Sequence, residues 1–77
     1  MFFSKTKIDD LVIIKPEIIE DERGFFAETL RLDLLEKFTS HKLEFCQQNT
    51  SSSKKGVFRG LHFQTYPYAQ TKLISVS

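Results

Sequence analysis

The apolar residues of this chain are divided among short runs, none long enough for more than one strand or two helical turns. Turn signals separate the runs, for example Lys15-Pro16 and the Asp-Glu-Arg-Gly segment at 21–24. The sequence contains no repeat and no linker. Short strands separated by turns are typical of a β-sandwich or a β-barrel. The sequence therefore predicts a mainly β fold.

The periodicity of each run and its flanking residues predict the element that it forms. Strands are predicted by residues 11–14, 25–31, 43–49, 57–64 and 72–76, and loops by 17–24, 50–56 and 65–70. One or two turns of helix are predicted at 33–38. Asp33 precedes Glu36 by three residues, as in a capping box, so Asp33 is expected to cap this helix.

Composition supports a folded protein. Hydrophobic residues make up 40% of the chain and charged residues 27%, which is ordinary for a globular domain. Eight Phe and two Tyr predict a well-filled core or an aromatic-lined cleft. The single cysteine, Cys46, excludes an internal disulfide, and we expect it to be buried in a protein of the reducing cytoplasm. Neither a signal peptide nor a membrane span is recognisable in the sequence.

The length of the chain bears on how complete its fold is. At 77 residues it forms one small domain at most. Its last residues, 73–77, stop within a predicted strand, whose unpaired edge would invite aggregation. A β-barrel is also hard to close with so few residues and no disulfide. We therefore expect residues 1–77 to be the N-terminal part of a single, longer domain.

Charge is distributed unevenly. The net charge is only +1, but every acidic residue lies at or before Glu44. Residues 45–77 carry Lys54, Lys55, Arg59 and Lys72 and no acid. Cations left without a carboxylate commonly bind an anion, and phosphate or an oxyanion formed in a reaction is the natural candidate.

His62 is the side chain in this acid-free stretch that is best suited to proton transfer. A lone histidine is more often part of a core, but Arg59 and Lys72 on neighbouring predicted strands favour a site. In a regular strand, residues 59 and 62 point to opposite faces. We therefore predict a bulge at Gly60 that directs Arg59 and His62 into one cleft.

Other polar side chains have two interpretations each. Gln47 and Asn49 share a face of a predicted strand and either bind a sugar or phosphate or form a plain polar surface. Arg23 and Glu28 flank a Phe-Phe pair, and a surface ion pair between them is the default expectation.

Several classes of site are poorly supported. Two histidines and no cysteine pair argue against a metal site. Neither GxGxxG nor a P-loop pattern occurs. Residues 55–58 resemble the start of an RNA-binding RNP1 motif, but the rest of that motif is missing.

Four motifs occur in order along the chain. They read DERGFFxET from Asp21, FxQxN from Phe45, GVxRGLHFQ from Gly56 and PxAQxKL from Pro67. Together they resemble the dTDP-4-dehydrorhamnose 3,5-epimerase family, whose fold is a cupin, a jelly-roll β-barrel. The resemblance runs from about Ile8 onward, so it implies that 1–77 is the N-terminal portion of a cupin epimerase domain, with its first strands and one short helix.

The resemblance implies an isomerase acting on a nucleotide-linked 4-keto sugar. In this family, dTDP-4-dehydro-6-deoxy-glucose is epimerised at C3 and C5, both α to the C4 ketone, to give dTDP-4-dehydro-L-rhamnose. By the same resemblance His62 is the catalytic base, Lys72 lies close to the C4 oxygen, and Arg59 contacts the substrate. Gln47 and Asn49 match positions that line the same pocket.

The remaining matches concern the nucleotide. Arg23 and Glu28 match positions that contact it, and in this family they reach the neighbouring subunit's site across a strand-exchanged homodimer. Phe26 is expected to pack near the base. The resemblance implies no metal and no redox cofactor, and neither nucleic acid nor membrane as a partner.

Two functional residues of the family have no counterpart here. These are a tyrosine that reprotonates the sugar from the opposite face and an aspartate that orients the histidine. We therefore expect the 77-residue chain to be inactive by itself. Two alternatives stay open: a related epimerase that inverts a single carbon or uses another nucleotide sugar, and a non-catalytic folding or assembly partner.

Overall fold

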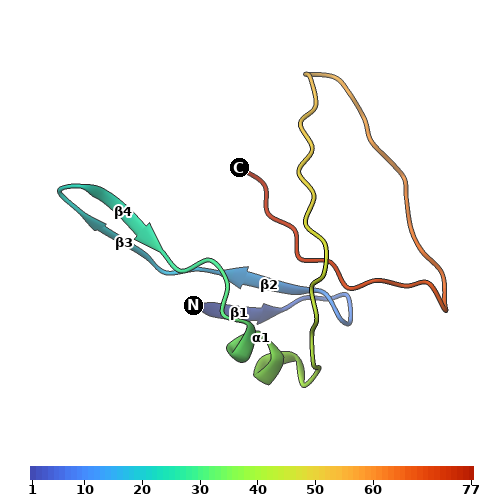
Figure 1. Cartoon of the computed structure of the whole chain (residues 1–77), viewed down its shortest axis with the longest axis horizontal. Coiled ribbons are helices and arrows are strands. Elements are labelled where there is room, and N and C mark those ends of the chain that lie inside the picture. Colours follow the sequence, from blue (N-terminus) through green and yellow to red (C-terminus); the bar gives the residue numbers. More distant parts are fainter. The chain divides into compact units, whose positions relative to one another are not determined.

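The structure, a computed structural model, describes all 77 residues (Figure 1). It contains four strands and one helix, all within the first of two compact units, Met1–Leu43, whereas Glu44–Ser77 form the second unit. The strands pair into two antiparallel hairpins, β1–β2 and β3–β4, and no barrel is closed. The elements are β1 Phe2–Lys5, β2 Val12–Lys15, β3 Ile18–Asp21, β4 Gly24–Ala27 and α1 Leu32–Thr39.

The first hairpin is closed by a side chain in its own loop. Phe3 pairs with Ile14 in the ladder, and Lys5 pairs with Val12. Next in the chain, the Thr6 hydroxyl donates to the Leu11 carbonyl at 2.9 Å and accepts the Ile8 amide at 3.2 Å. A hydroxyl that satisfies loop backbone groups in this way fixes the register of the strands it joins.

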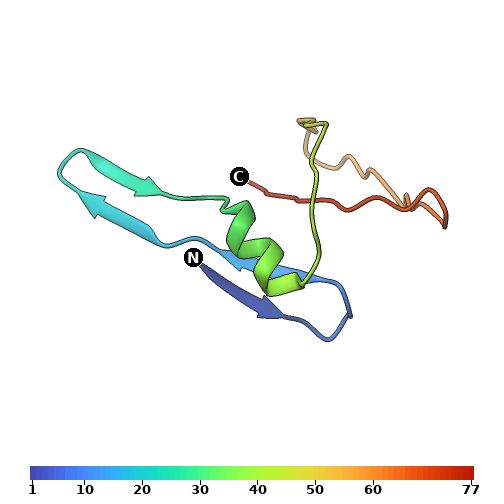
Figure 2. The same cartoon turned by 60° about the horizontal axis from the view of Figure 1, so that its bottom comes forward.

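The helix and the first hairpin form the small core of this unit. Leu35 is the one buried side chain, at 5% exposed, and Phe3 stacks on Phe38 with ring centroids 5.3 Å apart. The partly buried residues of α1 include Leu32 and Thr39, which lie three and four positions from Leu35 and so share its face. Both views show α1 beside the β1–β2 hairpin (Figures 1 and 2).

The ends of α1 correct the predicted capping box. Arg31 occupies the N-cap with an extended backbone and makes no side-chain capping bond, while Asp33 lies inside the first turn. A carboxylate there still suits the positive end of the helix dipole. At the other end, Ser40 takes a left-handed conformation with φ 60° and donates its amide to the Glu36 carbonyl at 2.8 Å. The prediction that Asp33 caps the helix was wrong.

The second hairpin turns tightly between Asp21 and Gly24, which are paired in the ladder. Asp21 Oδ1 accepts the Arg23 amide at 2.8 Å, and Gly24 has φ 127°, a conformation that favours glycine. Apolar side chains stand on both faces, because Ile19 pairs with Phe26 while Ile18 pairs with Ala27. The side chains of Ile18, Ile19 and Phe26 are all more than half exposed.

Several predictions for the first unit are confirmed. A mainly β fold with one short helix is confirmed, as are the strand at 11–14 and the helix at 33–38. The strand predicted at 25–31 ends at Ala27, and β3 occupies part of a segment predicted as turn. Strand β1 was not predicted, although its Phe-Phe pair lies just before the loop that returns the chain to β2.

The second unit has no helix or strand. Its backbone hydrogen bonds close two turns, one from the Val57 amide to Lys54 at 3.1 Å and one from the Tyr68 amide to Thr65 at 2.7 Å. The predicted loops at 50–56 and 65–70 are confirmed, whereas the strands predicted at 43–49, 57–64 and 72–76 are wrong. A strand exists only with a paired neighbour, and these segments pair with nothing in the chain.

Two further expectations are corrected by exposure. Cys46 is exposed rather than buried. The aromatic residues do not fill a core, because Phe3 and Phe38 are the only Phe or Tyr residues that are even partly buried.

Candidate functional site

The residues expected to act together are divided between the two units. Arg23, Phe26 and Glu28 belong to the first unit. The second unit holds Gln47, Asn49, Arg59, His62 and Lys72.

In the first unit, the turn of the β3–β4 hairpin carries a shallow hollow lined by Asp21, Arg23, Phe25 and Phe26. The Arg23 guanidinium contacts Asp21 Oδ2 through Nη2 at 2.6 Å and Nε at 3.2 Å. These hydrogen bonds hold the pKa of Asp21 below its usual range. The Arg23 side chain is nevertheless 89% exposed, so its other N–H groups are open to an anion beside an aromatic ring.

The ion pair expected between Arg23 and Glu28 does not form. Arg23, within the tight turn, pairs with Asp21 two residues before it, and Glu28 pairs with Arg31. In both cases the observed partner lies nearer in the sequence than the expected one.

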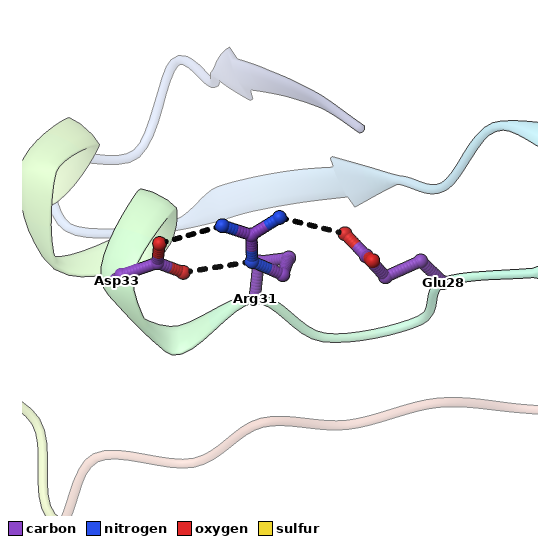
Figure 3. Close-up of polar contacts among 3 residues, drawn as sticks. All are labelled: Glu28, Arg31 and Asp33. Carbon is purple, nitrogen blue, oxygen red and sulfur yellow. Dashed lines mark hydrogen bonds and ion pairs between the residues drawn. The ribbon is translucent and has the colours of Figure 1, made fainter.

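Glu28 lies in the segment between β4 and α1, where Arg31 joins two carboxylates (Figure 3). Arg31 donates from Nε to Asp33 Oδ1 at 2.9 Å and from Nη2 to Oδ2 at 2.7 Å. Its third contact runs from Nη1 to Glu28 Oε1 at 3.4 Å. The side-chain hydrogen bonds to Arg31 lower the pKa of Asp33, and the same bonds raise the pKa of Arg31.

Arg31 is a candidate functional residue that the sequence motifs do not include. The signal available was an arginine three residues after one carboxylate and two residues before another, at the start of a predicted helix. Whether opposite charges at such spacings meet depends on the path of the backbone, which the sequence pattern alone does not reveal.

In the second unit, the two amides expected to face the substrate lie together. Gln47 Nε2 donates to Asn49 Oδ1 at 3.3 Å, and both side chains are exposed. The contact leaves the Gln47 oxygen and the Asn49 amino group available, which gives one acceptor and one donor on neighbouring side chains.

Arg59 is anchored to the serine-rich loop that precedes it. Its Nε donates to Ser53 Oγ, and its Nη2 donates to the Ser52 carbonyl at 3.2 Å. All three ion pairs of the chain lie in the first unit, so the cations of residues 45–77 have no carboxylate partner. A guanidinium oriented by neutral acceptors keeps its full charge for an anionic ligand.

His62 and Lys72 are exposed, and neither side chain makes a hydrogen bond within the chain. The bulge predicted at Gly60 required a strand through residues 57–64, and no ladder forms there. That hypothesis is therefore corrected together with the strand. No three side chains of the types His, Cys, Asp and Glu lie close enough to hold a metal ion.

Comparison with known proteins defines the class to which this chain belongs. The family model described as dTDP-4-dehydrorhamnose 3,5-epimerase matches residues 5–77. The chain is therefore a member of the dTDP-4-dehydrorhamnose 3,5-epimerase family, and the resemblance drawn from its four motifs is confirmed.

Curated relatives bear the same name. The protein called dTDP-4-dehydrorhamnose 3,5-epimerase in Shigella flexneri is 50% identical over 70 residues, which are 91% of this chain and 39% of that protein. Its namesake in Salmonella typhimurium is 46% identical over 74 residues, 96% of this chain and 40% of the relative. An archaeal relative with this name, from Methanothermobacter thermautotrophicus, is 43% identical over 74 residues, again 96% of this chain and 39% of its own length.

The chain thus spans about two fifths of the length of the curated relatives that it matches. None of the solved structures matches it. The chain's single helix, of eight residues, is too short to cross a membrane.

Proposed function

We propose that this chain supplies the proton-abstracting part of a dTDP-4-dehydrorhamnose 3,5-epimerase. The substrate is dTDP-4-dehydro-6-deoxy-glucose, and inversion at C3 and C5 gives dTDP-4-dehydro-L-rhamnose. Family membership over residues 5–77 supports this reaction. The observation that carries the proposal is the histidine in a stretch where Arg59 and Lys72 have no carboxylate partner.

The chemistry needs a base and a cation on one side of the sugar. Neutral His62 removes the proton from the carbon next to the C4 ketone. The electron pair of that C–H bond forms a double bond to C4, and the π pair of the carbonyl moves to the ketone oxygen. Lys72 stabilises the resulting enolate by its positive charge. Histidine suits the base because its charge changes between about pH 5 and 8. Reprotonation on the opposite face then inverts the carbon.

Substrate binding in this proposal uses both units. Arg59, Gln47 and Asn49 contact the sugar and phosphates with one guanidinium and two amides. Arg23 binds the nucleotide phosphates through its open N–H groups, Phe26 packs near the base, and Glu28 contacts the nucleotide. The first unit serves the site of a partner subunit in a homodimer. The exposed, unpaired Cys46 suits a protein of the reducing cytoplasm.

Solvent exchange tests the assignment of the base. The protein as its gene encodes it is incubated with substrate in D₂O, and deuterium at C3 and C5 is followed by NMR. We expect His62→Ala to lower exchange by about 10²- to 10⁴-fold, the usual contribution of a positioned general base. Lys72→Ala should slow exchange severely and should have a smaller effect on nucleotide binding. His41→Ala, at the chain's other histidine, serves as the control. Most of the turnover surviving in His62→Ala would show that the base is another residue.

The same experiment separates the alternatives. Deuterium at only one of the two carbons identifies a single-carbon epimerase. The 77-residue chain alone is expected to catalyse no exchange, because it contains no match for the opposite-face acid. If the encoded protein also catalyses none, while size-exclusion chromatography and circular dichroism show it folded with a partner, its role is assembly rather than catalysis.

A further inference from the structure

Asp33 fixes the orientation of the Arg31 guanidinium, which also donates a hydrogen bond to Glu28. Its two hydrogen bonds to Asp33, at 2.9 and 2.7 Å, form the parallel two-point contact in which a planar guanidinium meets a planar carboxylate. Asp33 lies in the first turn of α1, which packs through Leu35. The orientation of the guanidinium is therefore set by a helix rather than by a loop.

Glu28, in contrast, lies in the loop between β4 and α1. A glutamate in such a place has many rotamers, and holding it in one of them costs entropy. Its contact with a protein side chain is the 3.4 Å hydrogen bond that Oε1 accepts from Arg31 Nη1 (Figure 3). The second carboxylate oxygen, Oε2, accepts nothing and is free for a ligand donor.

From this arrangement we propose that Arg31 is a positioning residue that holds Glu28 so that its free oxygen accepts a hydrogen bond from the nucleotide part of the substrate. The inference rests on the proposed function, in which Glu28 contacts the nucleotide. It adds a residue that none of the four family motifs contains. Arg31 itself touches no reacting atom and acts through Glu28.

If Arg31 served only to stabilise the fold, its removal would lower stability rather than nucleotide affinity alone. The side chains of Arg31, Glu28 and Asp33 are 44%, 49% and 63% exposed, and ion pairs this exposed contribute little to stability. Removing Arg31 should therefore leave the fold intact. A selective loss of nucleotide affinity would then reflect the orientation of Glu28.

The test is a double-mutant cycle on the encoded protein. Calorimetry measures the Kd for dTDP, which needs no turnover, and steady-state kinetics measure KM and kcat. Arg31→Ala should raise the Kd and KM by about five-fold without changing kcat, as expected when a contact between neighbouring residues is lost. In the Glu28→Gln background the same substitution should change the Kd by less than about two-fold.

Two further variants define what Arg31 provides. Arg31→Lys keeps the positive charge but loses the two-point contact with Asp33, so its Kd should lie between those of the parent and Arg31→Ala. Lys37→Ala removes a cation from the last turn of the same helix and should leave the Kd unchanged.

The outcomes distinguish this inference from the proposed function. If Arg31→Ala leaves the Kd unchanged, or weakens binding equally in both backgrounds, Arg31 does not position Glu28, whatever the enzyme's activity. If dTDP binding shows the expected coupling but C3 and C5 exchange no deuterium, the proposed reaction is wrong and the role of Arg31 stands. Absence of dTDP binding would overturn both.

Discussion

The two units of this chain form different structures from the same kind of sequence pattern. Residues 1–43 contain every helix and strand of the structure, whereas residues 44–77 contain none. Yet both were predicted to hold strands, from runs of similar length and apolar content. The length and the apolar content of a run therefore do not by themselves decide whether it forms a strand.

What separates the units is whether a strand finds its partner nearby. In the first unit, the loop around Thr6 and the turn at Asp21 and Gly24 return the chain directly onto the preceding strand. In the second unit, the seven-residue loop at 50–56 joins two predicted strands without pairing them. Its apolar side chains stay in solvent, with Leu61 at 92% and Val76 at 93% exposed. Burial of these side chains would stabilise the unit, but no strand of the chain covers them.

Amide hydrogen exchange is expected to show the largest contrast. In the chain of residues 1–77, amides of β1, β2 and α1 should exchange at least about a hundredfold more slowly than those of residues 57–64, because only the former are hydrogen-bonded in a ladder or helix. Mass spectrometry of peptic peptides measures the difference. Equal protection in both units would remove the comparison altogether.

A graft sharpens the same contrast. Residues 44–77 can replace the matching segment of the Shigella flexneri relative, which is 50% identical to this chain over the matched region. If these residues lack only partners, their amides should gain protection in the graft. If they stay unprotected there, their sequence rather than their isolation prevents strands from forming.

Predictions were correct where the sequence signals of an element lie close together in the chain. The strand at 11–14 and the helix at 33–38 were predicted because their periodicity and stop signals lie within a few residues of one another. The Asp-Glu-Arg-Gly signal correctly marked a turn, but the isoleucines before it were assigned to that turn and β3 was missed. The strand at 57–64 depended on partners that periodicity does not identify.

The candidate site divides in the same way. Sequence motifs selected Arg23 and Phe26, and the structure brings both to one hollow at the β3–β4 turn. The partner of Arg23 was mistaken, because a neighbour two residues away across a turn cannot be ranked against one five residues away without the backbone path. Arg31 was missed for the same reason.

The next prediction concerns the one buried side chain. Leu35→Ala should destabilise the first unit by about 2 to 3 kcal/mol, because the substitution removes most of its one buried side chain. The identical substitution in the second unit, Leu61→Ala, should change stability by less than about 0.5 kcal/mol, since that side chain is in solvent. Urea unfolding followed by circular dichroism at the helix signal measures both. A large effect at Leu61 would reveal packing in the second unit.

The smallest expected effect is the response to acid, and it too should separate the units. The pKa values of Asp21 and Asp33 are lowered from 3.8 by their arginine partners, so each carboxylate stabilises the folded state at pH values above its unfolded pKa. That contribution is lost as the pH falls through the lowered, folded value. The second unit has one acidic side chain, Glu44, and no ion pair, so it should lack this response.

Carboxyl ¹³C chemical shifts followed from pH 6 to pH 2 test this directly. Asp21 and Asp33 should titrate below an ordinary aspartate, and Arg31→Ala should return the pKa of Asp33 toward 3.8 while leaving Asp21 unchanged. Because Asp21 keeps its own partner, Arg23, it is an internal control within the same unit. An unchanged Asp33 titration in Arg31→Ala would mean that the two side chains are not paired in solution. The anchor that orients Arg31 toward Glu28 would then be absent, and with it the physical basis for Arg31 as a positioning residue.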